Sequence, residues 1–219
     1  MEGDANILID FFGLITDFLV IIFQYVWCNK IEIFGVITGL AVIALQYKAI
    51  HWFAVIGSIS SALYIYIFYN EKFYADSGMS VYYLAANMYA IYVWIKLKKK
   101  HDNDNYGGIT KVPKRQIPIL IVICLLLIYP LYYILENYTD SPVALGDSIT
   151  TTLSFVAMWL LARKNIEHWL VWVAVNVIAT GLYIWKGLYP TSVLYGVYIV
   201  VSILGYINWK KKMYQLKPE

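Results

Sequence analysis

The sequence predicts an all-α integral membrane protein with seven transmembrane helices, and three observations support this class. Hydrophobic residues make up 61% of the 219 residues and charged residues only 14%, whereas soluble domains average about 45–50% and about 25%. The apolar residues run in blocks close to the ~20 residues that cross a bilayer as a helix. Lysine and arginine gather in alternate connections between these blocks, as they do in multi-pass proteins.

The predicted spans follow one another along most of the chain. They cover residues 31–47, 52–69, 79–97, 117–135, 143–162, 168–186 and 190–209. An eighth apolar block, 6–28, carries Asp10 and Asp17. We expect it to form an amphipathic helix at the membrane interface, with a further membrane span as the alternative.

The basic residues predict the orientation. If the connection 96–116 is cytoplasmic, 14 of the 17 lysines and arginines lie on that side and only Lys30, Lys72 and Lys186 lie opposite. Because basic residues are enriched in cytoplasmic loops, the C-terminus is expected in the cytoplasm. No aromatic residues or folded element accompany the basic runs, so nucleic acid is not an expected partner. The expected partner of these runs is the lipid bilayer.

The chain also has the pattern of a duplication. Residues 51–67 match 168–184 at a spacing of 117 through His51 and Trp52, and later pairs such as Trp94 and Trp209 match at 115. The predicted parts are an N-terminal amphipathic or interface helix (1–29), a first three-helix bundle (30–100), a cytoplasmic loop with a linker helix (101–140), a second three-helix bundle (141–212) and a cytoplasmic tail (213–219). An odd linker helix gives both bundles the same orientation, so the repeats are parallel, and transporters with such repeats bind substrate between them.

One face of the sixth span is not apolar. At about 100° per residue, Trp169, Trp172 and Asn176 fall on one stripe with Thr180 and Tyr183. A helix facing lipid has no need of such a stripe, whereas a helix lining a small-molecule pocket does. The expected substrate-binding residues are Trp169, Trp172, Asn176, Tyr183, Asn87, Tyr83, Gln46, Tyr195 and Tyr198.

Structural roles compete with this interpretation at several positions. Trp52, Trp94 and Trp209 lie near span ends, where tryptophan usually forms the interfacial belt. Ser202 is expected to pack between helices. Asp147 shares a face of the fifth span with Thr151 and Ser154, and its role stays open between site and outer surface.

The chemistry of the stripe favours a flat aromatic solute. The chain has 21 tyrosines and 8 tryptophans, and a desolvated cation over an indole face gains about 2 kcal/mol or more. We expect no lysine or arginine inside the membrane to receive an anion. The sequence has no phosphate-binding glycine-rich loop with lysine and no metal-ligand spacing, so no catalytic residue, cofactor or metal is expected. Asp147 and Glu32 are the only candidates for ion coupling.

The spacing Trp169-x-x-Trp172-x-x-x-Asn176, followed by Tyr183, Lys186-Gly187-Leu188 and Tyr195, resembles the nicotinamide riboside transporter (Pnu-type vitamin transporter) family. Glu32 with Gly35 and Gly39, and Tyr74-Ala75-Asp76, agree with it in the first half.

This resemblance implies a SWEET-like fold of two three-helix bundles joined by a linker helix. It implies facilitated diffusion of a vitamin across a bacterial inner membrane, trapping by a cytoplasmic kinase, and a homotrimer, with Trp169, Trp172 and Asn176 as binding residues. Nicotinamide riboside is the leading substrate. Thiamine is the main alternative because it is also a cationic heteroaromatic, and riboflavin is carried by other relatives. A membrane-embedded enzyme or a scaffold is the alternative from another class.

Overall fold

The computed structural model describes residues 30–70, 74–100, 108–139 and 141–215. In this part the chain forms seven helices and no strand: α2 (Lys30–Tyr47), α3 (Trp52–Asn70), α4 (Tyr74–Lys100), α5 (Ile117–Tyr138), α6 (Ala144–Ala162), α7 (His168–Trp185) and α8 (Tyr189–Gln215). The predicted N-terminal helix lies outside the described residues. By its contacts the chain divides into two compact units, Met1–Ala41 and Val42–Glu219. The second unit contains the site.

Each of the seven predicted spans coincides with one helix, so the all-α class is confirmed. Five helices of the described part are long and apolar enough to cross a membrane, namely α3, α5, α6, α7 and residues Thr191–Gln215 of α8. α4 is not among them, because tyrosines, Asn87 and a terminal lysine run reduce its apolar character. The polar content of α4 suits a helix that faces other helices.

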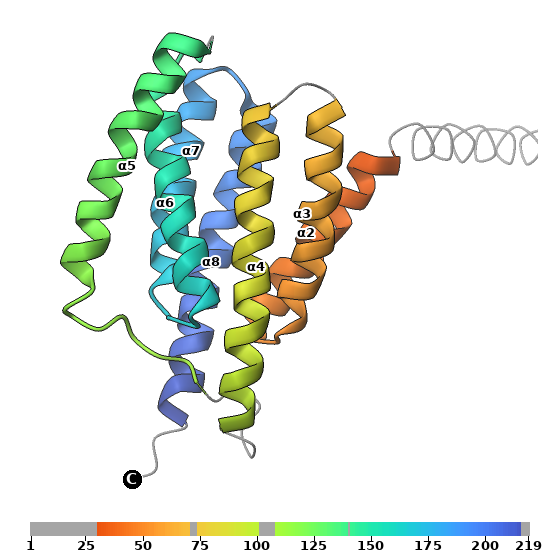
Figure 1. The fold of residues 1–219 in the computed structure, drawn as a ribbon, viewed down its shortest axis with the longest axis vertical. Coiled ribbons are helices and arrows are strands. Elements are labelled where there is room, and N and C mark those ends of the chain that lie inside the picture. The colour runs from red at the N-terminus through yellow and green to blue at the C-terminus, as the bar shows by residue number, and fades with distance from the viewer. Residues whose placement is uncertain (1–29, 71–73, 101–107, 140, 216–219) are drawn as a thin grey trace, which may run out of the picture. The chain divides into compact units, whose positions relative to one another are not determined.

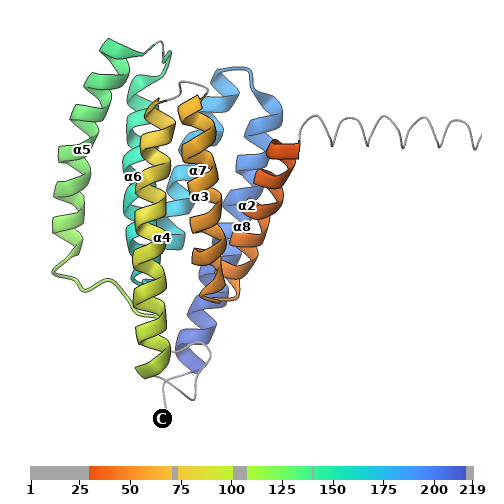
Figure 2. The ribbon, with the colours of Figure 1, turned by 45° about the vertical axis from the view of Figure 1, so that its right-hand side comes forward.

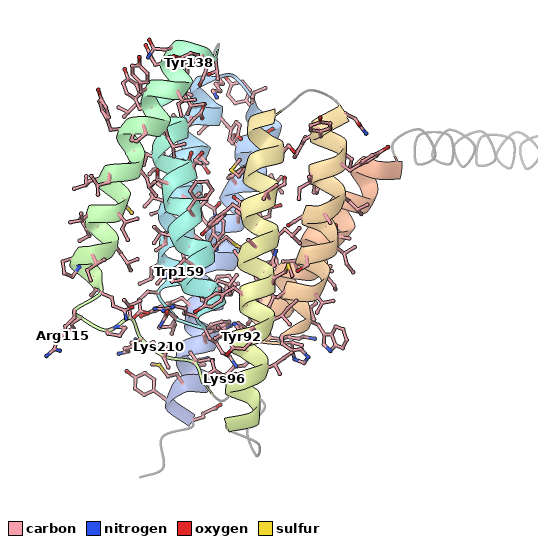
Figure 3. The ribbon with its side chains drawn as sticks, in the orientation of Figure 1. Tyr92, Lys96, Arg115, Tyr138, Trp159 and Lys210 are labelled. Carbon is pink, nitrogen blue, oxygen red and sulfur yellow. The ribbon has the colours of Figure 1, made fainter. Side chains whose placement is uncertain are left out.

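The helices of the second unit pack in sequence-adjacent pairs. α3 contacts α4, and α7 contacts both α6 and α8. The contact between α4 and α6 joins the first half of the chain to the second. α5 contacts α6 alone among the helices of the described part, and none of its residues is buried. α5 therefore lies at the margin of the bundle, as Figures 1 and 2 show.

The two halves of the chain are structural repeats at one register. Adding 115 to the bounds of α4, residues 74 and 100, gives those of α8, residues 189 and 215. The turns before α3 and α7 agree in detail: Ala49 N–H donates to Gln46 O and Lys164 N–H to Leu161 O, both at 2.9 Å. Ala49 and Lys164 are also the non-glycine residues with positive φ in the described part, at 57° and 60°.

The predicted spacing of 117 for the second helices is therefore wrong. Phe53, not His51, is the counterpart of His168: the ring of Phe53 lies 4.7 Å from Trp94 at 63°, and that of His168 lies 4.7 Å from Trp209 at 63°. The dipeptide His51-Trp52 matches His168-Trp169 in sequence by coincidence, two positions before the structural counterparts Phe53 and Ala54. Backbone hydrogen bonding defines the register because each turn must satisfy the same set of groups.

Two tryptophans expected in the interfacial belt lie instead in the core. Trp94 is 2% and Trp209 0% exposed, in a cluster at the end of the bundle that carries Lys96 and Lys210. Each indole N–H finds a buried backbone carbonyl, so neither needs the polar headgroup region. Trp52 is 55% exposed, in keeping with the belt.

Candidate functional site

The second unit contains a cavity of about 410 Å³ between its helices. This volume falls within the range of ~300–1,000 Å³ that is typical of small-molecule sites. Its walls come from α4, α6, α7, α8 and the last turns of α2. The residues that line it are Ile43, Gln46, Met79, Tyr83, Asp147, Thr150, Thr151, Ser154, Trp169, Trp172, Val175, Asn176, Ala179, Leu182, Tyr183, Lys186, Tyr195, Tyr198, Val201 and Ser202.

The structure brings eight of the nine sequence-predicted residues to this cavity. They are Trp169, Trp172, Asn176, Tyr183, Tyr83, Gln46, Tyr195 and Tyr198. Asn87 is the exception: it is 5% exposed, and its amide lies so close to α3 that a Cβ on Gly57 would come within 2.9 Å of it. Asn87 shares a helical face with Tyr83 but lies one turn further along α4. At that level the face packs against α3 and not against the cavity.

Trp169 forms the floor of the cavity at the lysine-rich end. Its side chain is 2% exposed, and the indole fits because α8 has a glycine, Gly205, where the two helices meet. A Cβ on Gly205 would lie 2.7 Å from three atoms of the indole. At the same positions of the first repeat stand Ala54 and Ala90, whose side chains are small. The large aromatic surface is therefore peculiar to the second repeat.

The polar groups of the middle of the cavity come from α7 and α8. Asn176 is 5% exposed, and its amide donates to Ser202 Oγ over a long 3.4 Å. Trp172, one turn earlier on α7, lines the same space. A weakly held amide beside an indole can exchange its partner for a ligand hydroxyl at small cost, because a long hydrogen bond is a weak one.

A cluster of tyrosines forms the wall above Asn176. The ring of Tyr195 lies 4.9 Å from Tyr183 and 5.7 Å from Tyr198. Tyr83 completes the lining from α4. Four phenols on one cavity provide both aromatic faces and hydroxyl groups, which suits a ligand that is flat in one part and hydroxylated in another.

An ion pair lies at the end of the cavity opposite the lysine-rich end. Lys186 Nζ is 3.6 Å from Asp147 Oδ2, and the two side chains are 22% and 33% exposed. Ser141 Oγ donates to the same carboxylate at 2.6 Å. Lys186, which the sequence places on the side opposite the 96–116 connection, thus also lines the cavity, because α7 ends one residue before it and turns it toward the first turn of α6. The positive charge is nevertheless matched by Asp147.

Several other lining residues were not among the predicted binding residues. The polar face of the fifth span, with Asp147, Thr151 and Ser154, was recognised as a pattern without being assigned to the site, and it does line the cavity. Ser202 was assigned to packing and does both, since it accepts from Asn176 and borders the space. Met79 and Thr150 carried no signal, because a thioether or a threonine is common on packed helix faces.

No group of three or more His, Cys, Asp and Glu side chains in the described part of the chain is arranged to hold a metal ion. The cavity is lined by aromatic, amide and hydroxyl groups with one ion pair. Such a lining can bind and orient an organic solute.

Comparison with known proteins gives a consistent family assignment. A family model described as the nicotinamide mononucleotide transporter matches residues 29–211. The nicotinamide riboside transporter PnuC of Escherichia coli is 28% identical over 175 residues, which cover 69% of this chain and 72% of that protein. The protein of the same name from Haemophilus influenzae is 24% identical over 153 residues, 68% and 65% of the two chains.

A solved structure shows the same fold. The crystal structure of the vitamin B3 transporter PnuC superposes with a TM-score of 0.67 at 21% identity, and the match covers 90% of this chain and 88% of that one.

Proposed function

The chain belongs to the nicotinamide mononucleotide transporter family and is a membrane transporter rather than an enzyme; from this premise we propose that it carries nicotinamide riboside by facilitated diffusion. The observation that carries the proposal is the cavity between the helices, with Trp169, Trp172 and Asn176 on one wall. The relatives of this chain are named for nicotinamide riboside, and the cavity has the chemistry that this solute requires.

The aromatic part of the solute is a pyridinium ring, a delocalised cation. Indole is the best of the side-chain rings for binding such a cation, and the interaction is worth ~2 kcal/mol or more when water is excluded. Trp169 is buried and Trp172 is half-buried, and both line the cavity. The nicotinamide ring is proposed to lie against these two indoles at the lysine-rich end of the cavity.

The ribose part of the solute needs hydrogen bonds. Asn176, Gln46 and Ser202 present amides and a hydroxyl within the same cavity, and Asn176 is held only by its 3.4 Å bond. The tyrosines Tyr83, Tyr183, Tyr195 and Tyr198 add hydroxyl groups near the opposite end.

The ion pair at the end of the cavity opposite the lysine-rich end supports the nucleoside over the nucleotide. Lys186 is the only cation among the lining residues of the described part, and Asp147 already neutralises it at 3.6 Å. A phosphate group at this position would have to displace the carboxylate or remain beside it. A solute that carries a single positive charge meets no such conflict.

The same ion pair supports passive transport. Asp147 is the only carboxylate that lines the cavity in the described residues, and it bonds both Lys186 and Ser141. A carboxylate that already pairs with a lysine and accepts from a hydroxyl has little free capacity to coordinate a coupled cation. The solute would move down its gradient and be retained by a cytoplasmic kinase.

The cellular setting follows the same reasoning. We place the chain in a bacterial inner membrane with its C-terminus in the cytoplasm, because 14 of 17 basic residues lie on the side of the 96–116 connection. Alternating access would come from motion of the repeat that contains α3 and α4 against the repeat that contains α6, α7 and α8. The unburied face of α5 is a suitable surface for lipid or for further copies in a homotrimer.

Binding to purified protein tests the site. Trp172→Ala should weaken nicotinamide riboside binding about thirtyfold, because it removes a cation–π contact of ~2 kcal/mol, as measured by calorimetry. Trp185→Ala, on the same helix but 66% exposed, is the matched control and should leave the affinity unchanged. Equal affinities for both variants and the wild type would exclude the indole site.

Thiamine is the second candidate, because its cationic ring would use the same indole surface. Competition between the two vitamins in the same calorimetric assay decides between them, and we expect nicotinamide riboside to bind more tightly. Tighter binding of thiamine would reverse the assignment without removing the site.

Uptake into proteoliposomes tests the mode of transport. The initial rate should be the same with and without a proton or sodium gradient, because the cavity has no free carboxylate to couple it. Asp147→Asn should also leave the rate insensitive to either gradient. A gradient-dependent rate in the wild type would replace facilitated diffusion with coupled transport.

A further inference from the structure

The cavity is closed at the lysine-rich end by a layer of aromatic side chains with internal symmetry. Trp169 forms the floor, and His168 and Trp209, both 0% exposed, lie directly beneath it. The ring of Trp94 lies 5.9 Å from that of Trp209. A solute that enters past Asp147 and Lys186 has to pass this layer to leave at the lysine-rich end.

Two hydrogen bonds in this layer cross between the repeats, and they are mutual counterparts. Trp94 of the first repeat donates through Nε1 to Leu161 O of the second at 3.2 Å. Trp209 of the second donates through Nε1 to Gln46 O of the first at 2.8 Å. Trp209 stands 115 positions after Trp94, and Leu161 stands 115 positions after Gln46. Each repeat therefore bonds the turn of the other through an equivalent pair of groups, an indole N–H and a backbone carbonyl.

The acceptors of these bonds lie at the end of a helix, next to a strained residue. Gln46 and Leu161 each accept a second hydrogen bond, from Ala49 N–H and Lys164 N–H, the two residues with positive φ. Non-glycine residues in this conformation persist only when surrounding contacts hold them. The indole bonds thus tie each repeat to the hinge-like turn of its partner.

The layer also contains two polar atoms without a partner in the described part of the chain, Nε2 of His168 and Nε1 of Trp169. Nδ1 of His168 lies 2.7 Å from Asn165 O and so carries the proton, which leaves Nε2 as an acceptor. The other unpaired atom, Nε1 of the next residue, Trp169, is a hydrogen-bond donor. Unpaired buried groups are costly, so they oppose the closed arrangement that the two indole bonds favour.

We propose that Trp94 and Trp209 form a reciprocal gate at the lysine-rich end, closed by their two cross-repeat hydrogen bonds and predisposed to open by the unpaired His168 and Trp169. This inference rests on the proposed transport function, because a gate has meaning only for a solute that crosses the layer. The repeats separate at this end when both bonds break together. Trp209 is also a positioning residue, since it bonds the backbone of Gln46 and packs against the ring of Trp169, two cavity residues.

The first repeat supplies a natural test of the unpaired histidine. Phe53 occupies the position equivalent to His168 and meets Trp94 at the same distance and angle as His168 meets Trp209. His168→Phe therefore places a side chain that already fits this environment and removes the unpaired acceptor. It should hold the gate closed, whereas Trp94→Phe and Trp209→Phe, which keep an aromatic ring but lose the donor, should loosen it.

The experiment measures how often the layer opens. Leu161→Cys places a thiol at a fully buried position while keeping the backbone carbonyl, in a full-length chain with Cys28→Ala and Cys124→Ala. The rate of reaction with N-ethylmaleimide should rise roughly threefold to tenfold in Trp94→Phe and in Trp209→Phe, the effect of one neutral hydrogen bond on an equilibrium. The rate should fall in His168→Phe and stay unchanged in Trp185→Phe, a control at the opposite end of α7.

Binding and transport by the same proteins separate the possible failures. Nicotinamide riboside should still bind Trp94→Phe, His168→Phe and Trp185→Phe, and its uptake into proteoliposomes should slow in His168→Phe. Unchanged labelling in both tryptophan variants would overturn the gate. If the tryptophan variants do not fold, His168→Phe decides alone, and an unchanged labelling rate in it overturns the gate. Absence of nicotinamide riboside binding to the wild type would instead remove the proposed substrate and leave the labelling result intact.

Discussion

At the residue scale, Gly205 makes room for the indole of Trp169, which lines the cavity. A Cβ at this position would come within 2.7 Å of the indole of Trp169. We predict that Gly205→Ala costs about 1–3 kcal/mol of stability through overpacking and weakens nicotinamide riboside binding by moving the indole. Thermal unfolding in detergent and calorimetry measure the two effects.

Gly196 provides the control on the same helix. A Cβ there meets no atom within 4 Å, and alanine in a helix is favoured over glycine by roughly 0.5–1 kcal/mol. Gly196→Ala should therefore be at least as stable as the wild type and should bind equally well. Equal losses in both variants would show that any methyl group on α8 is harmful and that Gly205 has no special role.

At the element scale, the turns that end α2 and α6 carry the strain of the repeat. Ala49 has φ of 57° and is 3% exposed. We predict that Ala49→Gly is at least as stable as the wild type, because the left-handed conformation costs an alanine about 1–2 kcal/mol and glycine is free of it. Chemical denaturation in detergent provides the measurement.

A buried alanine inside a helix shows the opposite response. Ala157 of α6 is 0% exposed and helical, so Ala157→Gly should lose about 1 kcal/mol from helix propensity alone. If Ala49→Gly lost as much as Ala157→Gly, the turn would carry no strain worth relieving.

At the scale of the whole molecule, the distribution of basic residues predicts which end faces the cytoplasm. Arg115 lies at the lysine-rich end and Tyr138 at the opposite end of α5. In intact cells a membrane-impermeant maleimide should label Tyr138→Cys at once and Arg115→Cys only after permeabilisation, in a background without Cys28 and Cys124. The reverse pattern would invert the orientation while leaving the fold as it is.

The duplicated architecture also explains why the site is asymmetric. At the positions of Trp169 and Trp172 the first repeat has Ala54 and Gly57, and at that of Asn176 it has Ser61. The turns and the cross-repeat hydrogen bonds are alike in both halves, so the scaffold is conserved between them. Both repeats therefore contribute a tryptophan to the aromatic layer at the lysine-rich end, whereas Trp169 belongs to the second alone.

The sequence by itself determined the helices and the aromatic and amide stripe that forms part of the cavity wall. The length of each apolar block defines a span because only a helix of that length satisfies its backbone across hydrocarbon. The stripe on α7 was visible because helical period is a local property, and Trp169, Trp172 and Asn176 do line one cavity.

The tertiary structure decided what depends on contacts between distant segments. It turned Asn87 toward α3, brought Lys186 to Asp147, and buried Trp94 and Trp209 against carbonyls of the other repeat. It also gave the repeat a register of 115, where matching letters suggested 117 for part of the chain. A hydrogen bond across 163 residues, such as that of Trp209 with Gln46, leaves no periodic trace, because both partners are ordinary residues in their own helices.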